Sequence, residues 1–251
     1  MSVLSTITKP SDRAIIATIT GDAGVGKTTL ACTFPNPIVI RVEDGLQSIP
    51  LDQRPDAFPI IQSVDELWSQ FSALINEKHD YKSVIIDSVT KLDRMFIDYI
   101  VASDPKNPKS INSALGGYGS GLMAVSGMHQ RVRKAAELLN NKGMNVIFIA
   151  HADTVTIELP DEDPYTRYDL RLGKKSIAPY VDDVDMVCFI KLETYTTGDG
   201  DRKKAISDGT RVAITYSTAA NVSKNRFGIT EPLIVLQGQN PFKQYIKILG
   251  A

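Results

Sequence analysis

The chain contains the sequence Gly21-Asp22-Ala23-Gly24-Val25-Gly26-Lys27-Thr28, which fits the pattern G-x-x-x-x-G-K-[ST]. Glycines in such a loop allow backbone N–H groups to surround phosphate oxygens, which bulkier residues would block. Lys27 supplies a positive charge for the β- and γ-phosphates of a nucleotide, and the Thr28 hydroxyl is a ligand for Mg²⁺. The sequence therefore predicts a phosphate-binding loop. The residues expected to contact the nucleotide are Gly21, Asp22, Ala23, Gly24, Val25, Gly26, Lys27, Thr28 and Thr29.

The segments on either side of this loop are those that the motif requires. An apolar, β-branched run over residues 14–20 predicts a buried strand that leads into the loop. Residues 29–34 predict a short helix that stops at Pro35. This helix is expected to begin near Lys27, with its positive end toward the phosphates. A glycine-rich turn without function is the competing interpretation, and the strand–loop–helix order argues against it.

Composition limits the classes of protein to which the chain can belong. Its 251 residues suffice for one large α/β domain, and 43% hydrophobic residues is typical of a globular core. The formal net charge of −1 indicates that any surface for nucleic acid must be a local patch. Cys32 and Cys188 lie in apolar runs, which indicates buried thiols in a reducing compartment. The sequence has no signal peptide or membrane-spanning run, so we expect a cytoplasmic protein without a membrane partner.

Strands and helices are predicted to alternate along the chain. We expect strands over residues 37–42, 59–62, 82–87, 145–150, 184–192 and 212–216, with short edge strands over 233–236 and 245–249. Helices are expected from Ser63 to near His79, from 89 to about 100, and up to Gly143. A long polar loop, with a hairpin as the alternative, is expected over 152–175. This alternation predicts a mostly parallel sheet with helices on both faces.

Three polar side chains follow different strands of this predicted sheet: Glu43, Asp87 and His151. Ligands of parallel sheets bind beyond the carboxyl ends of the strands, so we expect these residues at the same edge as the phosphate-binding loop. Asp87 ends a hydrophobic strand, a position from which an acid holds Mg²⁺ in phosphate-loop enzymes. Glu43 is the candidate general base for the attacking water, with Asp44 as its rival. Ordinary strand-end or turn acids without a function are the alternatives.

The order of several motifs resembles the RecA-like ATPase core, a group that includes recombinases, the repair ATPase RadA, KaiC and ring helicases. These motifs are residues 21–28, Glu43, residues 84–88 and the segment Lys224-Asn225-Arg226-Phe227-Gly228. The sequence is also similar to compact phage RecA-core proteins that act in single-strand annealing or recombination. The segments that carry this similarity are residues 33–37, 43–45 and 150–151. The resemblance implies a RecA-like P-loop NTPase of the α/β class, as one domain over residues 1–251. Its implied parts are an N-terminal extension (1–12), the core (13–228) and a C-terminal edge segment (229–251).

The resemblance also implies cofactors and roles for individual residues. The cofactors are ATP and Mg²⁺, with Thr28 and Asp87 at the metal, and the catalytic residues are Lys27, Glu43, His151, Lys224 and Arg226. His151 stands where these families often have a glutamine or another polar residue that senses the γ-phosphate. Lys224 and Arg226 match cationic fingers that enter the ATP site of a neighbouring subunit, which implies a homo-oligomeric ring or filament. As alternatives, His151 is an ordinary strand-end histidine, and the basic pair lies in an exposed turn.

Two segments are candidates for contact with single-stranded DNA. Residues Gly116–Gly121 are predicted to form a flexible loop from which Tyr118 stacks on a base. Residues 152–175 combine aromatic rings, which stack on bases, with cations, which follow phosphates. The candidate DNA-binding residues are Tyr118, Tyr165, Arg167, Tyr168, Arg171, Lys174 and Lys175. Acidic residues within the second segment weaken this indication of DNA binding. Residues Arg202–Lys204 are predicted to form an exposed turn.

These observations favour an ATP-hydrolysing RecA-like phage protein that binds single-stranded DNA and promotes annealing or homologous recombination in the cytoplasm of a bacterial host. A single-stranded DNA-binding protein is a further candidate partner. Two alternatives stay open: a KaiC-like nucleotide-dependent oligomeric switch without DNA binding, and a small-molecule kinase. A kinase needs an acceptor pocket and usually a lid. The cationic pair far along the chain favours ATP chemistry between subunits instead.

Overall fold

The computed structural model describes residues 3–9, 11–197 and 204–250. Six parallel strands form the centre of its main sheet: β1 (Ile16–Gly21), β2 (Pro37–Arg41), β3 (Asp56–Ala57), β4 (Ser83–Asp87), β5 (Asn145–Leu159) and β7 (Met186–Leu192). Antiparallel strands β10 (Arg211–Ile214), β11 (Lys224–Asn225) and β12 (Leu233–Ile234) extend one side. The main path of the sheet is β12-β10-β7-β1-β5-β4-β2-β3. Arg202 and Lys203, predicted to form an exposed turn, lie outside the described residues.

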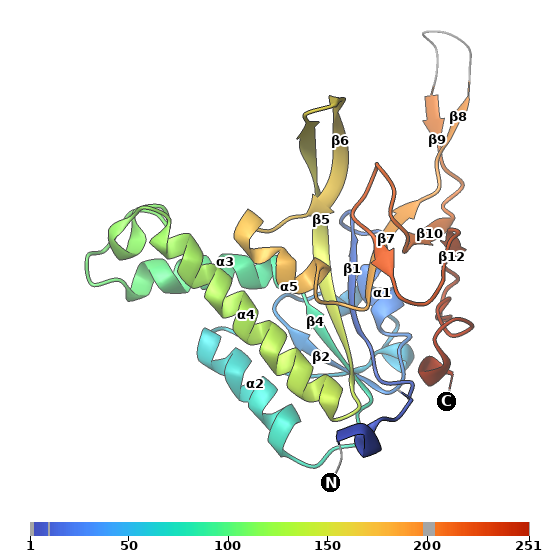
Figure 1. Ribbon diagram of the computed structural model, residues 1–251, viewed down its shortest axis with the longest axis horizontal. Helices are drawn as coiled ribbons and strands as arrows, with labels where there is room; N and C mark the ends of the chain where they lie inside the picture. The colour runs from blue at the N-terminus through green and yellow to red at the C-terminus, as the bar shows by residue number, and fades with distance from the viewer. Residues whose placement is uncertain (1–2, 10, 198–203, 251) are drawn as a thin grey trace.

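Helices cover both faces of this sheet (Figure 1). The helices are α1 (Lys27–Ala31), α2 (Val64–Asn76), α3 (Val89–Ser103), α4 (Ser120–Asn141) and α5 (Ala178–Val181). One core cluster joins the sheet to α2, α3 and α4, and a second joins it to α1 and to the C-terminal segment that contains Phe242 and Leu249. The predicted α/β class, with a mostly parallel sheet between helices, is confirmed. No helix in the described ranges is long and apolar enough to span a membrane.

Local sequence explains where the long helices begin. Ser63 caps α2, because its Oγ accepts a hydrogen bond from the Glu66 backbone N–H over 3.2 Å. The Glu66 carboxylate accepts in turn from the backbone N–H of Gln62. Ser88 occupies the same position before α3 and accepts from Lys91 N. Helix α2 ends at Asn76, slightly before the predicted end near His79.

Two predicted strands are wrong. Residues 59–62 form no strand, and the short strand β3 lies just before them at Asp56–Ala57. Phe58 N and Ile61 N still donate to β2 carbonyls, but Pro59 has no N–H with which to continue the ladder. The predicted edge strand at 245–249 is instead packed against the sheet face and ends in a 3₁₀ helix over Lys247–Leu249.

The predicted loops also differ from the structure. Residues 152–175 contain a β-hairpin, the alternative interpretation, because β5 continues to Leu159 and returns as β6 (Glu162–Leu170). This hairpin projects from the end of the sheet in Figure 1, as does a smaller one formed by β8 (Tyr195–Thr197) and β9 (Lys204–Ile206). The predicted flexible loop at Gly116–Gly121 is shorter than expected, because α4 begins at Ser120.

Candidate functional site

The phosphate-binding loop connects β1 to α1 at the carboxyl edge of the sheet. Its first residue must be small: a Cβ on Gly21 would lie 2.3 Å from the carbonyl oxygen of Ile190 on β7. Lys27 is buried, and its Nζ donates to the carbonyls of Gly21 and Asp22 over 3.0 and 2.7 Å. Burial lowers the pKa of Lys27, and the nearby carboxylates of Asp87 and Glu43 oppose this effect. The loop thus presents a desolvated cation to the space above it.

Asp87 and Thr28 form an oxygen pair beside this cation. The Thr28 Oγ1 donates to Asp87 Oδ2 over 2.9 Å. Burial raises the pKa of Asp87 to about 6, while the hydrogen bond from Thr28 acts in the opposite direction. A Cβ on Gly45 would lie 2.7 Å from Asp87 Oδ2 and 3.5 Å from Thr28 Oγ1, so glycine keeps the space beside both oxygens open.

The donor set of this pair fits Mg²⁺. In nucleotide sites Mg²⁺ is held by one or two protein oxygens, with phosphate oxygens and waters as its other ligands. Among the described residues, no group of three or more histidine, cysteine or acidic side chains could hold a metal alone. Thr28 and Asp87 would therefore hold the ion together with a bound nucleotide.

Glu43 follows β2 and lies within the same group. Its Oε1 accepts from Ser88 Oγ over 2.7 Å and lies 3.4 Å from His151 Nε2. The hydrogen bond with His151 lowers the pKa of Glu43, burial opposes it, and the hydrogen bond from Ser88 lowers it further. The carboxylate is thus fixed by two neighbours and ionised, while its side chain keeps 27% of its surface exposed. It can meet the requirements of a general base that faces water.

Asp44, the rival acid, has different partners. Its carboxylate lies 3.7 Å from Arg41 and accepts from Gln47 over 3.2 Å, and its side chain is 44% exposed. Although Asp44 also lines the cavity, the hydrogen bonds from Ser88 and His151 go to Glu43. The geometry therefore favours Glu43 as the base.

His151 lies inside β5 rather than just beyond it. It is in register with Gly21 of β1, and its backbone N–H donates to Thr90 Oγ1 over 2.9 Å. Its carbonyl accepts from the backbone N–H of Arg171, where the hairpin returns to the sheet. His151 thus connects the Glu43 carboxylate with the base of the β5–β6 hairpin.

One cavity of about 450 Å³ is lined by Lys27, Thr28, Glu43, Asp44, Asp87 and His151. Besides the predicted residues, it is lined by Arg211 at the start of β10 and Gln237 after β12, both of which the sequence analysis missed. No local motif marks either residue. The position of Arg211 could have been inferred only from the direction of its strand: β10 is antiparallel to β7, so its first residue lies at the edge where the parallel strands end.

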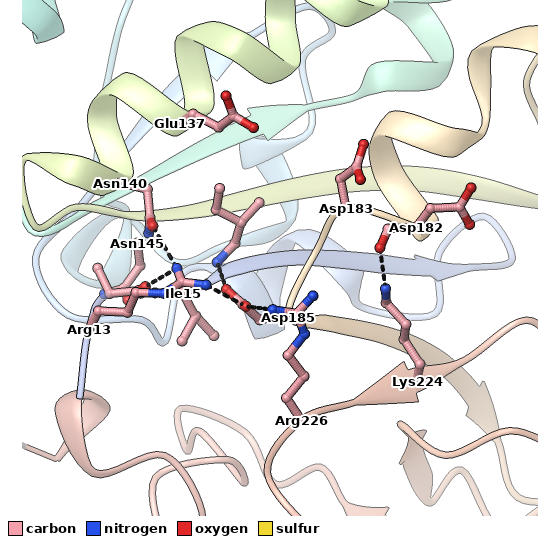
Figure 2. Close-up of polar contacts among 12 residues, drawn as sticks. Arg13, Ile15, Glu137, Asn140, Asn145, Asp182, Asp183, Asp185, Lys224 and Arg226 are labelled. Atoms are coloured by element: carbon pink, nitrogen blue, oxygen red, sulfur yellow. Dashed lines mark hydrogen bonds and ion pairs between the residues drawn. The ribbon is translucent and has the colours of Figure 1, made fainter. Parts of the chain in front are cut away.

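Lys224 and Arg226 do not join this group. They lie beside the beginning of β7, at the other end of the sheet (Figure 2). Lys224 Nζ donates to the Asp182 carbonyl over 2.6 Å, and an Arg226 guanidinium nitrogen lies 3.2 Å from Asp185 Oδ1. Asn225 fixes the turn, since its Oδ1 accepts from two backbone N–H groups further along. Within one subunit the basic pair is remote from the phosphate-binding loop, and its role in a neighbouring site stays a prediction.

The candidate DNA-binding residues fall into three groups. Tyr118 is fully exposed, and Lys175 Nζ approaches its loop to within 3.8 Å of a Cβ built on Gly119. Lys174 is exposed beside Lys175. Tyr165 and Arg167 lie on β6, where Arg167 contacts Asp169 at 3.4 Å. The third group is Tyr168 and Arg171, which are exposed but also make contacts within the fold.

Tyr168 and Arg171 have clear structural partners. The ring of Tyr168 stacks on Phe189 with the centroids 4.9 Å apart. The guanidinium of Arg171 donates to the Ala152 carbonyl over 3.0 Å and lies 3.6 Å from Asp153. The charge of Arg171 also acts on the pKa of Lys27, so this residue lies near the phosphate-binding loop. A role for either residue in DNA binding stays a prediction.

Comparison with known proteins gives a family for the chain. A family model described as an AAA domain matches residues 13–227, which is most of the sequence. No curated protein matches it. The match includes the phosphate-binding loop, the acid at the end of β4 and the parallel sheet that brings them together. The chain belongs to the AAA domain family of P-loop nucleotide triphosphatases.

Proposed function

We propose that this protein is a RecA-like ATPase that binds single-stranded DNA and promotes its annealing or recombination. The observation that carries the hydrolytic part is the Glu43 carboxylate, held by Ser88 and His151 in the cavity that Lys27 and Asp87 also line. Membership of the AAA domain family supports ATP as the substrate.

Each group in the cavity has a role in this proposal. Lys27 and the loop amides bind the phosphates, and Thr28 with Asp87 holds Mg²⁺, which neutralises phosphate charge when bound. Glu43 orients a water molecule and accepts its proton. His151 fixes the carboxylate of Glu43 and lines the cavity, from which it senses the γ-phosphate. Together these groups supply what ATP hydrolysis needs within one subunit, apart from a cationic finger.

The finger is proposed to come from a second copy of the chain. Lys224 and Arg226 lie outside the cavity of their own subunit, and Arg226 keeps 59% of its side chain exposed. A cation that enters a neighbouring site offsets the charge on the transferred phosphoryl group. The active form is therefore a ring or filament of identical subunits.

Support for DNA binding comes from the region around Tyr118. Its exposed ring lies on the loop that Lys175 approaches, and Ser126 of α4 donates to the Lys175 carbonyl over 2.7 Å. A ring that stacks on bases beside cations that bind phosphates suits a single strand. The β5–β6 hairpin starts from the strand that carries His151, so the nucleotide can influence the segment that ends at Lys175.

Fluorescence anisotropy with a labelled single-stranded oligonucleotide tests this proposal, with ATP, with ADP and without nucleotide. We expect binding that depends on ATP, and faster annealing of complementary strands. Tyr118→Ala should weaken binding about five- to a hundredfold, because stacking contributes about 1–3 kcal/mol per base. Tyr99→Ala, which changes an exposed tyrosine on α3, is the matched control.

The outcomes separate the candidate functions. ATP hydrolysis without DNA binding in any nucleotide state would contradict the DNA role and favour a nucleotide-dependent oligomeric switch. Transfer of the γ-phosphate to a small molecule, measured with labelled ATP, would instead identify a kinase. Absence of ATP binding would overturn the proposal as a whole.

A further inference from the structure

Arg211 lies beside the phosphate-binding loop although it is far from that loop in the sequence. In the sheet, Gly21 is in register with Ile190 of β7, and Arg211 with Leu192, two residues further on. The first residue of β10 is thereby carried just past the point where β1 enters the loop. A Cβ placed on Gly26 would lie 3.3 Å from Arg211 Nε and 3.7 Å from its Cζ. The guanidinium therefore packs against the loop backbone.

The charge of Arg211 has no acidic partner in the described part of the chain. Arg211 lines the same cavity as Lys27, which is also a cation. A guanidinium that lines a cavity without an acidic partner of its own attracts an anionic ligand. A guanidinium in such a position suits phosphate, which it can bind with two parallel hydrogen bonds.

The strand order fixes the side from which Arg211 approaches. β10 lies on one side of β1, beyond β7, whereas His151 on β5 and Glu43 after β2 lie on the other side. Arg211 is thus on the opposite side of β1 from Glu43 and His151.

A second cavity, of about 540 Å³, adjoins the first. The two share Thr29, Ile49, Gln53 and Gln237 as lining residues. The chain that leads to Gln237 is tied to Arg211, because Val235 N donates to the Arg211 carbonyl over 2.8 Å. This cavity offers room for a nucleoside, and a nucleoside bound there would place its first phosphates in the adjoining cavity, which Arg211 lines.

We infer that Arg211 binds the α- and β-phosphates of the nucleotide held by its own subunit. This inference rests on the proposed ATP-binding function and adds a cation in cis to the one proposed in trans. It assigns to Arg211, the first residue of β10, a role in retaining the nucleotide rather than in bond cleavage. ATP and ADP should depend on Arg211 to the same extent.

Binding of fluorescent ATP and ADP analogues to the full chain tests this inference. Arg211→Ala should weaken both about tenfold or more, the value of a lost charge-assisted bidentate contact. Arg211→Lys keeps the charge but loses the planar fork, so its nucleotide affinity should lie between those of the wild type and Arg211→Ala. In steady-state hydrolysis the KM for ATP should rise more than kcat falls. Arg94→Ala, which changes an exposed arginine on α3, should leave both ligands unaffected.

The other outcomes overturn the inference in distinct ways. Unchanged affinity in folded Arg211→Ala and Arg211→Lys proteins would exclude a phosphate contact. Loss of ATP affinity with normal ADP affinity, or loss of kcat with normal KM, would move the contact to the γ-phosphate. If Lys27→Ala retains tight nucleotide binding, the ATP-binding function itself is wrong. If only Arg211 is without effect, the function stands and this inference fails.

Discussion

The two ends of β1 hold charged groups in opposite conditions. At its beginning, Asp185 is 8% exposed and lies 2.8 Å from Arg13 and 3.2 Å from Arg226. Its second oxygen accepts from the Ile16 backbone N–H over 3.0 Å. At the other end, Lys27 and Arg211 line a cavity, and Arg211 has no acidic partner among the described residues.

The contrast is between charged groups that stabilise the fold and charged groups that are available to a ligand. A buried acid with all its hydrogen bonds made inside the chain stabilises the arrangement of the strands around it. Cations that face a cavity, beside an acid with a raised pKa, are typical of a functional site. Substitutions at the two ends should therefore have different effects, on stability at one end and on chemistry at the other.

The largest effect is expected at the cavity end, from Lys27→Ala. The variant should lose tight ATP binding, with hydrolysis reduced by more than about 10³, because no other side chain replaces this desolvated ammonium in the loop. Nucleotide binding and phosphate release are the measurements. The melting temperature should change little, since the Lys27 ammonium donates to two carbonyls of the loop itself. Hydrolysis at the wild-type rate would rule out the phosphate-binding loop.

Arg226→Ala tests whether a charged group at the beginning of β1 contributes to hydrolysis as well as to the fold. If Arg226 acts only on its own fold, hydrolysis should be normal; if it acts in a neighbouring site, ATP should bind normally and hydrolysis should fall about 10³-fold. We expect the second result, with an intact fold because Arg13 still pairs with Asp185. Specific activity of the wild-type protein should rise with its concentration.

Mixing Arg226→Ala with Glu43→Gln protein provides the control for action in trans. In a mixed assembly, some interfaces join an intact Glu43 to an intact Arg226 of the neighbour. These interfaces should recover activity that neither variant has alone. No recovery in mixtures that demonstrably co-assemble would assign Arg226 to the fold. Every charged group at the beginning of β1 would then serve stability, and only those at its other end would serve chemistry.

Glu43→Gln should keep nucleotide affinity and slow hydrolysis by at least about 10², the usual contribution of a general base. The amide keeps the shape of the carboxylate but cannot accept a proton from water. Asp44→Asn is the matched control, because Asp44 lines the same cavity but lies next to Arg41. Single-turnover hydrolysis at saturating ATP distinguishes them. The reverse pattern would make Asp44 the base.

Asp185→Asn should have the smallest effect on activity and a measurable effect on stability. We expect a loss of about 2 kcal/mol in the free energy of unfolding, since an uncharged amide satisfies its three donors less well. Both arginines are more than half exposed, so solvent screening limits the loss. Urea unfolding measures it, with ATP affinity expected to be unchanged. Asp98→Asn, at an exposed ion pair with Arg94, should cost less than about 0.5 kcal/mol.

Elements that depend on neighbouring residues could be predicted from the amino-acid sequence alone. The phosphate-binding loop, the buried strands and the cap at Ser63 depend on residues next to one another, so the sequence pattern was sufficient. The gathering of Glu43, Asp87 and His151 followed from one general rule, that parallel strands end at a common edge. The same pattern could not decide between a loop and a hairpin over residues 152–175, because polar residues are compatible with both.

Which cations line the cavity beside the phosphate-binding loop depends on the tertiary structure. Lys224 and Arg226 attract attention in the sequence, yet strand β11 carries them to the beginning of β7, where Asp182 and Asp185 hold them. Arg211 stands in no motif, yet the antiparallel direction of β10 brings it against Gly26. Strand order and direction in the added part of the sheet depend on packing between distant segments. For that reason the position of a single arginine on β10 could not be predicted from its neighbours in the chain.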